Sequence, residues 1–146
     1  MSTASNKTSH LQDLKINIKL KLSALWVALM FCYVYGDFFT LFVPGRIQGL
    51  INGQSGAGKT TPAMLLIYAI MLSVPPLMIF LSLVLKPKVN RVANIFTGIF
   101  FTLVMILVVL TSLEKWMAFY IYLGILEIII TCLITIYAFK WPKTED

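Results

Sequence analysis

Four apolar runs, each 22 to 24 residues long, constrain the fold of this sequence more than any other feature. They span residues 22–43, 62–85, 92–113 and 116–139. About 20 apolar residues in a helix cross the roughly 30 Å hydrocarbon layer of a bilayer. A helix satisfies its own backbone N–H and C=O groups there, and the alternating strands of about 10 residues that build a membrane barrel are absent. The sequence therefore predicts an all-α fold, a four-transmembrane-helix bundle.

Composition supports a membrane protein built as one domain. Hydrophobic residues make up 59% of the chain and charged residues 12%, whereas a soluble domain carries about 25% charged residues. No long-period repeat or second domain is visible. We predict a single integral membrane domain over residues 1–146, with residues 1–13 as a disordered tail.

The basic residues predict the orientation in the membrane. With four spans, the N-terminal tail, the 86–91 loop and the C-terminal tail share one side, and nine of the twelve basic residues lie there. They are Lys7, Lys15, Lys19, Lys21, Lys86, Lys88, Arg91, Lys140 and Lys143. The positive-inside rule then places both termini in the cytoplasm of a cell-membrane protein. Topology and attraction to the lipid bilayer explain the +6 net charge, so we expect no nucleic-acid partner.

Residues 53–60 read GQSGAGKT and fit the phosphate-loop pattern of nucleotide-binding proteins. A phosphate loop leads from a β-strand into a helix, but this stretch lies in the 44–61 loop, on the side away from the cytoplasm. Pro62 disfavours helical backbone angles at Thr61, so Thr61-Pro62 fits better as an N-cap followed by a first-turn proline. We predict no nucleotide binding at 53–60. The loop is a connector or a lid over an outward-facing cavity, with a short interfacial helix around Ile47, Leu50 and Ile51.

Two carboxylic acids lie inside the predicted spans. At 1.5 Å per residue, Asp37 is about 10 Å and Glu127 about 16 Å from the outer ends of their helices. A charged carboxylate at that depth costs a few kcal/mol unless it is paired, hydrated or protonated. Helical spacing places each acid on a polar stripe, which predicts one interior binding site. Its residues are Asp37, Glu127, Tyr33, Tyr120 and Thr131.

A structural role for these acids remains open as an alternative. Asp37 would then bond a tyrosine or a helix end near the interface, and Glu127 would bond between helices as a neutral acid. Asn90, Arg91 and Asn94 are expected to begin the third span at the cytoplasmic surface, where they cap the helix and contact lipid headgroups. Pro75-Pro76 should kink the second span.

The sequence contains little evidence for a redox or catalytic centre. Cys32 and Cys132 fit small hydrophobic residues inside helices, and the one histidine, His10, lies in the tail. The spans therefore cannot supply a histidine pair for haem, a metal cluster or a histidine-dependent triad. We predict no cofactor, no metal and no enzymatic activity.

Several short stretches resemble a family of small prokaryotic four-helix integral membrane proteins of unknown function. They are KLSALW at 21–26, YGD at 35–37, PG at 44–45, NRVANI at 90–95 and GILEIIITCLITIYAFKW at 124–141. The resemblance covers about residues 14–141. It implies four helices, an acid late in the first, an Asn-Arg pair opening the third and a glutamate in the fourth. It implies no activity, substrate or cofactor.

Three functional classes stay open on the sequence alone. Intramembrane acids favour a small-solute or proton-coupled transport unit, expected to form a homo-oligomer because four helices enclose little volume. A non-catalytic subunit that docks an unknown membrane partner is the second class. The third is a quinone-linked redox accessory, since the chain is similar in fold alone to four-helix membrane proteins of the DoxX type.

The predicted topology is tested by reporter fusions. A fusion at residue 146 or in the 86–91 loop should report cytoplasm, and one in the 44–61 loop should not. A cytoplasmic 44–61 loop would invert the orientation and return GQSGAGKT to the compartment that holds nucleotides.

Overall fold

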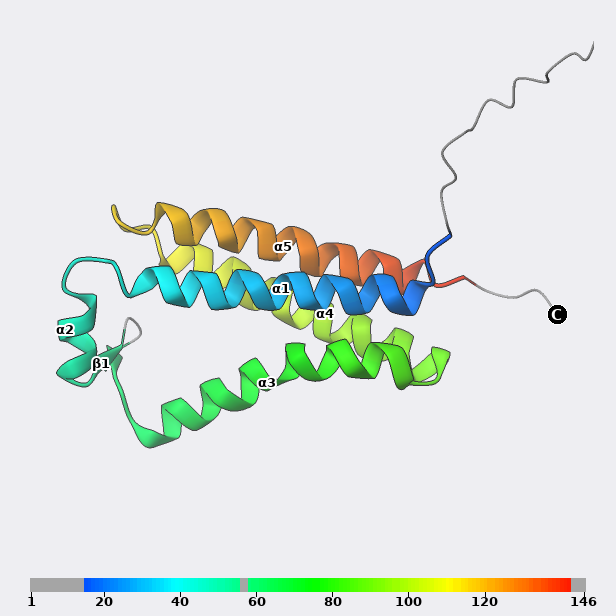
Figure 1. Cartoon of the computed structure of the whole chain (residues 1–146), viewed down its shortest axis with the longest axis horizontal. Coiled ribbons are helices and arrows are strands. Elements are labelled where there is room, and N and C mark those ends of the chain that lie inside the picture. Colours follow the sequence, from blue (N-terminus) through cyan, green and yellow to red (C-terminus); the bar gives the residue numbers. More distant parts are fainter. Residues whose placement is uncertain (1–14, 56–57, 143–146) are drawn as a thin grey trace, which may run out of the picture.

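The structure is a computed structural model that describes residues 15–55 and 58–142. The predicted disordered tail lies outside the described residues. The described elements are α1 (Ile18–Thr40), α2 (Arg46–Ile51), β1 (Gln54–Ser55), β2 (Gly58–Lys59), α3 (Pro62–Val84), α4 (Pro87–Thr111) and α5 (Ala118–Phe139). The four long helices lie alongside one another, and each is long and apolar enough to cross a membrane (Figure 1). The predicted four-helix bundle is confirmed.

Capping residues, rather than hydropathy, fix where the helices begin. α1 starts at Ile18, four residues before the apolar run, because the Asn17 side chain accepts a hydrogen bond of 2.9 Å from the Lys19 backbone N–H. α4 starts at Pro87, where proline fits the first turn of a helix. Both helices therefore extend past the apolar runs at the end of the bundle that carries both termini. We call this the terminal end, and the opposite end, with the 41–61 and 112–117 connections, the loop end.

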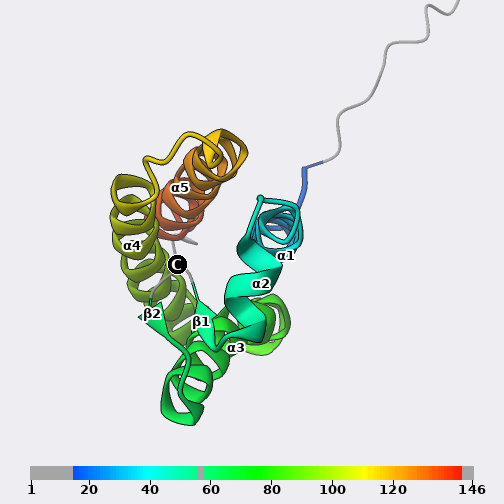
Figure 2. The same cartoon turned by 90° about the vertical axis from the view of Figure 1, so that its left-hand side faces the viewer.

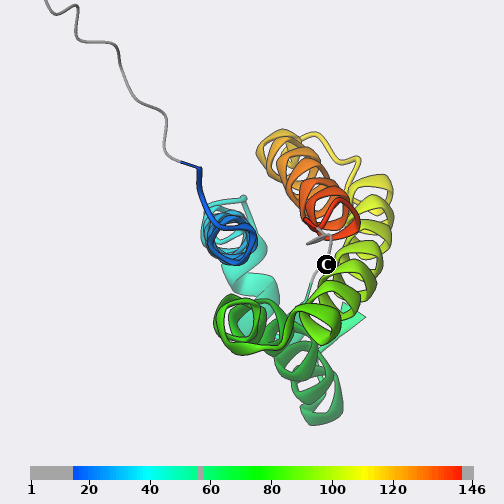
Figure 3. The same ribbon diagram turned by 90° about the vertical axis from the view of Figure 1, so that its right-hand side faces the viewer.

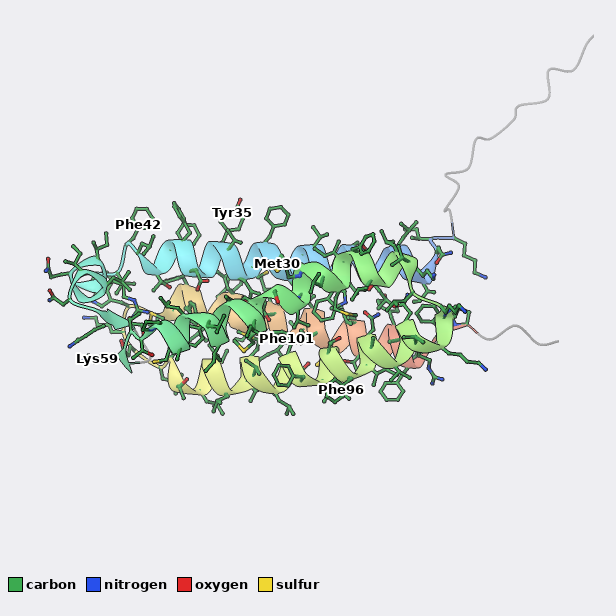
Figure 4. All side chains as sticks on the ribbon, turned by 90° about the horizontal axis from the view of Figure 1, so that it is seen from below. Met30, Tyr35, Phe42, Lys59, Phe96 and Phe101 are labelled. Carbon is green, nitrogen blue, oxygen red and sulfur yellow. The ribbon has the colours of Figure 1, made fainter. Side chains whose placement is uncertain are left out.

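The bundle is closed on one side and loose on the other. α4 packs most extensively on α5, and α1 packs on both α5 and α3, whereas α3 and α4 touch only sparsely. Views along the bundle from the loop end and from the terminal end show this arrangement (Figures 2 and 3). The buried core lies between the well-packed helices and consists of Leu22, Trp26, Leu29, Met78, Phe101 and Ile134. Figure 4 shows Phe101 between the helices, while Tyr35 and Phe96 point outward.

A glycine permits the close approach of α4 and α5. A Cβ atom at Gly98 would collide with the Thr135 hydroxyl and lie 3.3 Å from the Thr131 carbonyl oxygen. Small residues at such crossings let helix backbones approach in a membrane, where packing replaces the hydrophobic effect as the driving force. Gly98 therefore sets the spacing of the most extensive helix pair.

α3 divides into two unlike halves at its two internal prolines, Pro75 and Pro76. The residues of α3 that are buried are Pro75, Met78 and Ser82, so none before Pro75 is buried. Prolines remove backbone donors and bend a helix, and Figure 1 shows the first half of α3 leaning away from the other helices. The half near the loop end is therefore poorly packed.

Two basic side chains join the helices at the terminal end. Lys19 Nζ donates hydrogen bonds to the carbonyl oxygens of Leu83 (3.1 Å) and Leu85 (2.7 Å), where α3 ends. Arg91 donates to the Ala138 carbonyl through Nε (3.2 Å) and to the Phe139 carbonyl through Nη2 (3.4 Å), where α5 ends. The last carbonyls of a helix lack intrahelical donors and carry partial negative charge. Each cation therefore ties its own helix to the C-terminus of a neighbour.

Substituting Gly98 by alanine should destabilise the bundle by about 1–3 kcal/mol, the usual cost of overpacking a well-packed site. Gly36→Ala is the matched control, because a Cβ there lies 3.5 Å from the Tyr120 ring, an ordinary contact. We expect thermal unfolding of the purified protein to begin at a lower temperature for Gly98→Ala alone. Equal melting temperatures for the two variants would show that the α4–α5 spacing does not depend on Gly98.

Candidate functional site

Glu127 is a buried acid without a complete set of hydrogen bonds. It lies on α5 with 3% of its surface exposed. Among the described residues, the buried side-chain oxygens without a hydrogen-bond partner are Glu127 Oε2 and the Tyr33 hydroxyl. Buried polar atoms in proteins are nearly always paired, so each exception needs a physical explanation. Tyr33 lies on α1 and Glu127 on α5, two helices that pack together, and the two groups are within electrostatic range of each other.

Four of the five predicted site residues come together near the middle and the loop end of the bundle. Tyr33 and Asp37 on α1 and Tyr120 on α5 all lie within electrostatic range of Glu127. Tyr120 packs against Gly36, directly beside Asp37. We call Tyr33, Asp37, Tyr120 and Glu127 the acidic site.

Thr131, the fifth predicted residue, is fully buried, but its hydroxyl forms hydrogen bonds outside the acidic site. Its hydroxyl lies 2.9 Å from the Glu127 backbone carbonyl and 2.8 Å from the Thr102 hydroxyl. Threonine hydroxyls in membrane helices often bond to the preceding turn or across to a neighbouring helix. Thr131 therefore links α5 to α4 beside the acidic site, and its hydrogen-bonding capacity does not go to the carboxyl groups.

Asp37 is exposed although it lies on the inward face of α1. It follows Trp26 by eleven residues, about three helical turns, so the two side chains project in nearly the same direction. Trp26 is completely buried, because the second half of α3 covers α1 there; Ser23, nearby, donates a 3.0 Å hydrogen bond to the Ile79 carbonyl. The first half of α3 provides no such cover at the level of Asp37.

The terminal half of the bundle contains a second polar cluster, formed by Trp26, Ser82, Asn90 and Asn94, whose side chains are hydrogen-bonded to one another. Asn94 Oδ1 accepts hydrogen bonds from Trp26 Nε1 (2.8 Å) and the Ser82 hydroxyl (3.3 Å). Asn94 Nδ2 donates to the Asn90 side chain (2.7 Å) and backbone carbonyl (2.9 Å). Asn90 Nδ2 in turn donates to the Ser82 carbonyl (2.6 Å). This amide cluster connects α1, α3 and α4, and both asparagines are completely buried.

The predicted headgroup contact is therefore wrong for Asn90 and Asn94. α4 begins a turn earlier than the apolar run, which carries both amides inside the bundle. The sequence contains a signal for this position, because the two asparagines continue the helical spacing of the buried α4 residues Gly98, Phe101 and Met105. Arg91 caps a helix as predicted, although it caps the C-terminus of α5 rather than its own helix.

The GQSGAGKT stretch forms part of a small hairpin. β1 and β2 pair antiparallel, with Gln54 opposite Lys59. Helix α3 begins only at Pro62, after Thr61, whose hydroxyl accepts a 3.2 Å hydrogen bond from the Met64 backbone N–H. The predicted Thr61 cap is thus confirmed. Lys59 lies in a strand, whereas the lysine of a phosphate loop opens a helix; the absence of nucleotide binding stays a prediction.

The predicted short helix in the 44–61 loop is confirmed as α2. Its residues Ile47, Leu50 and Ile51 are exposed on the protein surface, and apolar side chains on such a helix suit the membrane interface. Arg46, the first residue of α2, lies within electrostatic range of Asp37. The loop therefore brings one positive charge towards the open side of the acidic site.

Comparison with known proteins identifies the family. The model of DUF6326, described as a family of unknown function, matches residues 11–146. The chain belongs to DUF6326. This confirms the resemblance to small four-helix membrane proteins of unknown function, and no curated protein or solved structure matches the chain.

Proposed function

We propose that this DUF6326 protein is a proton-coupled small-solute transport unit in which Glu127 takes up and releases the coupled proton. The observation that carries the proposal is the buried, unpartnered Oε2 of Glu127. An ionised carboxylate without partners inside a bilayer costs several kcal/mol, so a closed site holds the acid in its neutral form. A carboxyl group that is neutral when enclosed and charged when wetted or paired can couple a proton to the movement of another solute.

The unequal packing of the two halves supports a site that opens towards one side. At the terminal end, Lys19 and Arg91 join neighbouring helices, and the amide cluster has its hydrogen bonds satisfied. At the loop end, α3 has no buried residue before Pro75, and Asp37 is exposed. Prolines are frequent where membrane helices bend. The first half of α3 is thus the element best placed to move in a transport cycle.

The distribution of basic residues predicts which side of the membrane the acidic site faces. If the terminal end is cytoplasmic, as the positive-inside rule predicts, the acidic site in this conformation faces the outside through Asp37. Glu127 would then exchange its proton with the outer solution, and closure of α3 over α1 would precede opening at the cytoplasmic side. This orientation is part of the proposal and is tested by the reporter fusions.

A partner-docking subunit is the second candidate, because the loop end carries an aromatic groove on the bundle surface. Its lining residues are Phe39, Phe42, Val43, Trp116 and Phe119. A docking subunit would depend on this groove and not on Glu127. The two functions therefore differ in which substitution removes the activity.

The transport proposal is tested in liposomes loaded with a pH-sensitive dye. A small-molecule extract of the source cells is added outside, and equal potassium on both sides with valinomycin holds the membrane potential at zero. Wild-type protein should change the lumenal pH faster than Glu127→Gln, which keeps size and hydrogen-bonding ability but cannot titrate. Glu114→Gln, a change of an exposed acid in the 112–117 connection, is the control and should match wild type. Equal rates of lumenal pH change with wild type and Glu127→Gln would contradict the proposal.

A further inference from the structure

The geometry points to a small organic cation with an ammonium group as the ligand of the acidic site, where it replaces the proton of Glu127. This inference rests on the proposed function for the role of Glu127 and adds the chemical class of the solute. It depends on four features of the site: its charge, the number of its ligating groups, its aromatic rings and its open side.

The charge of the site favours a cation over an anion. The site contains two carboxyl groups, and the basic group of Arg46 lies within electrostatic range of Asp37 and Tyr120. Deeper in the bundle, the groups that act electrostatically on Tyr33 are Glu127, Tyr120 and Cys32, and the group that acts on Glu127 is Asp37. A desolvated anion there would meet no compensating charge, whereas a cation would pair with Glu127.

The number of ligating groups favours an ammonium over a metal ion. The described residues contain no group of three or more His, Cys, Asp or Glu side chains placed to hold a metal. The hydroxyl of Thr131, four residues after Glu127 on α5, is already bonded to Thr102 and to a backbone carbonyl. Calcium takes six to eight oxygen ligands and magnesium demands near-octahedral geometry. An ammonium needs fewer acceptors, and the unpartnered Glu127 Oε2 and Tyr33 hydroxyl are free to accept its hydrogen bonds.

Aromatic rings neighbour the two tyrosines of the acidic site. The Tyr33 ring lies 6.4 Å from Phe101, and Phe101 meets Trp26 edge to face at 6.1 Å. On the other side, Tyr120 belongs to the site and follows Phe119 at a ring separation of 6.2 Å. Aromatic faces attract ammonium groups by about 0.5–2 kcal/mol each, more strongly when water is excluded. A carboxylate with aromatic neighbours is the usual combination that recognises an amine.

An apolar surface at the loop end suits the rest of such a ligand. Asp37 is exposed, and the aromatic groove, with a volume of about 380 Å³, lies at the same end of the bundle and is lined in part by Phe39 of α1 and Phe119 of α5. The groove offers the alkyl part of an amphiphilic amine an apolar contact at the end of the bundle where Asp37 is exposed.

The exchange conserves charge at the site. The Glu127 carboxylic acid loses its proton to the solution at the loop end, and the carboxylate then pairs with the ammonium. One positive charge leaves and one enters, so the net charge of the site is the same before and after the exchange. Because the ligand and the proton compete for one carboxylate, affinity should rise with pH, by up to tenfold per pH unit.

Calorimetric titration of the protein in lipid nanodiscs with n-butylammonium and tetramethylammonium tests this inference. Both ions should bind to wild type, more tightly as the pH is raised from 6 to 8, with release of about one proton, measured in buffers of different ionisation enthalpy. Glu127→Gln should abolish binding of both, and the Glu114→Gln control should bind as wild type does. Thermal melting of each variant verifies its fold.

A second variant separates hydrogen bonding from charge. Tyr33→Phe keeps the ring and removes the unpartnered hydroxyl, so it should weaken n-butylammonium about fivefold, the effect of one hydrogen bond. It should leave tetramethylammonium, which has no N–H, unchanged. If Glu127→Gln fails to fold, this selective loss remains as the test of the site.

Three results would overturn the inference: no binding of either ion to wild type, equal binding to Glu127→Gln, or affinity that does not change with pH. Failure of ammonium binding while a Glu127-dependent change of lumenal pH persists in liposomes would remove the ligand class and leave the transport proposal. Ammonium binding that depends on Glu127, without any Glu127-dependent change of lumenal pH, would support the inference and contradict transport.

Discussion

A polar group without a hydrogen-bond partner is strongly destabilising inside a bilayer, and this penalty determines where polar side chains lie in the interior of the protein. Each unsatisfied group costs several kcal/mol because no water is present to compensate it. The amide cluster meets the requirement fully: each Asn94 amide atom has a partner on α1, α3 or α4. Glu127 Oε2 and the Tyr33 hydroxyl do not meet it. The buried polar groups of the amide cluster are therefore paired, whereas two of those in the acidic site are not. We expect the acidic site to be the one that binds a ligand.

The two regions also differ in their freedom to move. Lys19, Arg91 and the amide cluster fasten the terminal end through hydrogen bonds between helices. Beyond Pro75 towards the loop end, α3 loses its buried contacts. A segment with few buried contacts opens at lower free energy than a packed one. In the proposed transport cycle, the fixed end serves as the base against which the first half of α3 moves.

Much of this fold could be predicted from the sequence, because hydropathy and capping are local. The four helices follow from apolar length, the start of α3 from Thr61-Pro62, and the acidic site from two acids on polar stripes. The features that depend on packing were less accessible. Judged by hydropathy, Asn90 and Asn94 lie at the start of the third span; in the structure α4 already begins at Pro87, which buries them. Thr131 bonds to Thr102 because Gly98 brings α4 close to α5. The exposure of Asp37 depends on the direction in which α3 bends away; Pro75-Pro76 predicts the position of that bend but not its direction.

The protonation of Glu127 tests most directly whether the unsatisfied acid is a working site. In lipid at neutral pH, the infrared spectrum of wild-type protein should contain a carbonyl band of a protonated carboxylic acid that is missing from Glu127→Gln. Addition of n-butylammonium should replace that band by carboxylate bands. An ionised Glu127 without any ligand, or an acid band that is the same in wild type and Glu127→Gln, would contradict the role assigned to this residue.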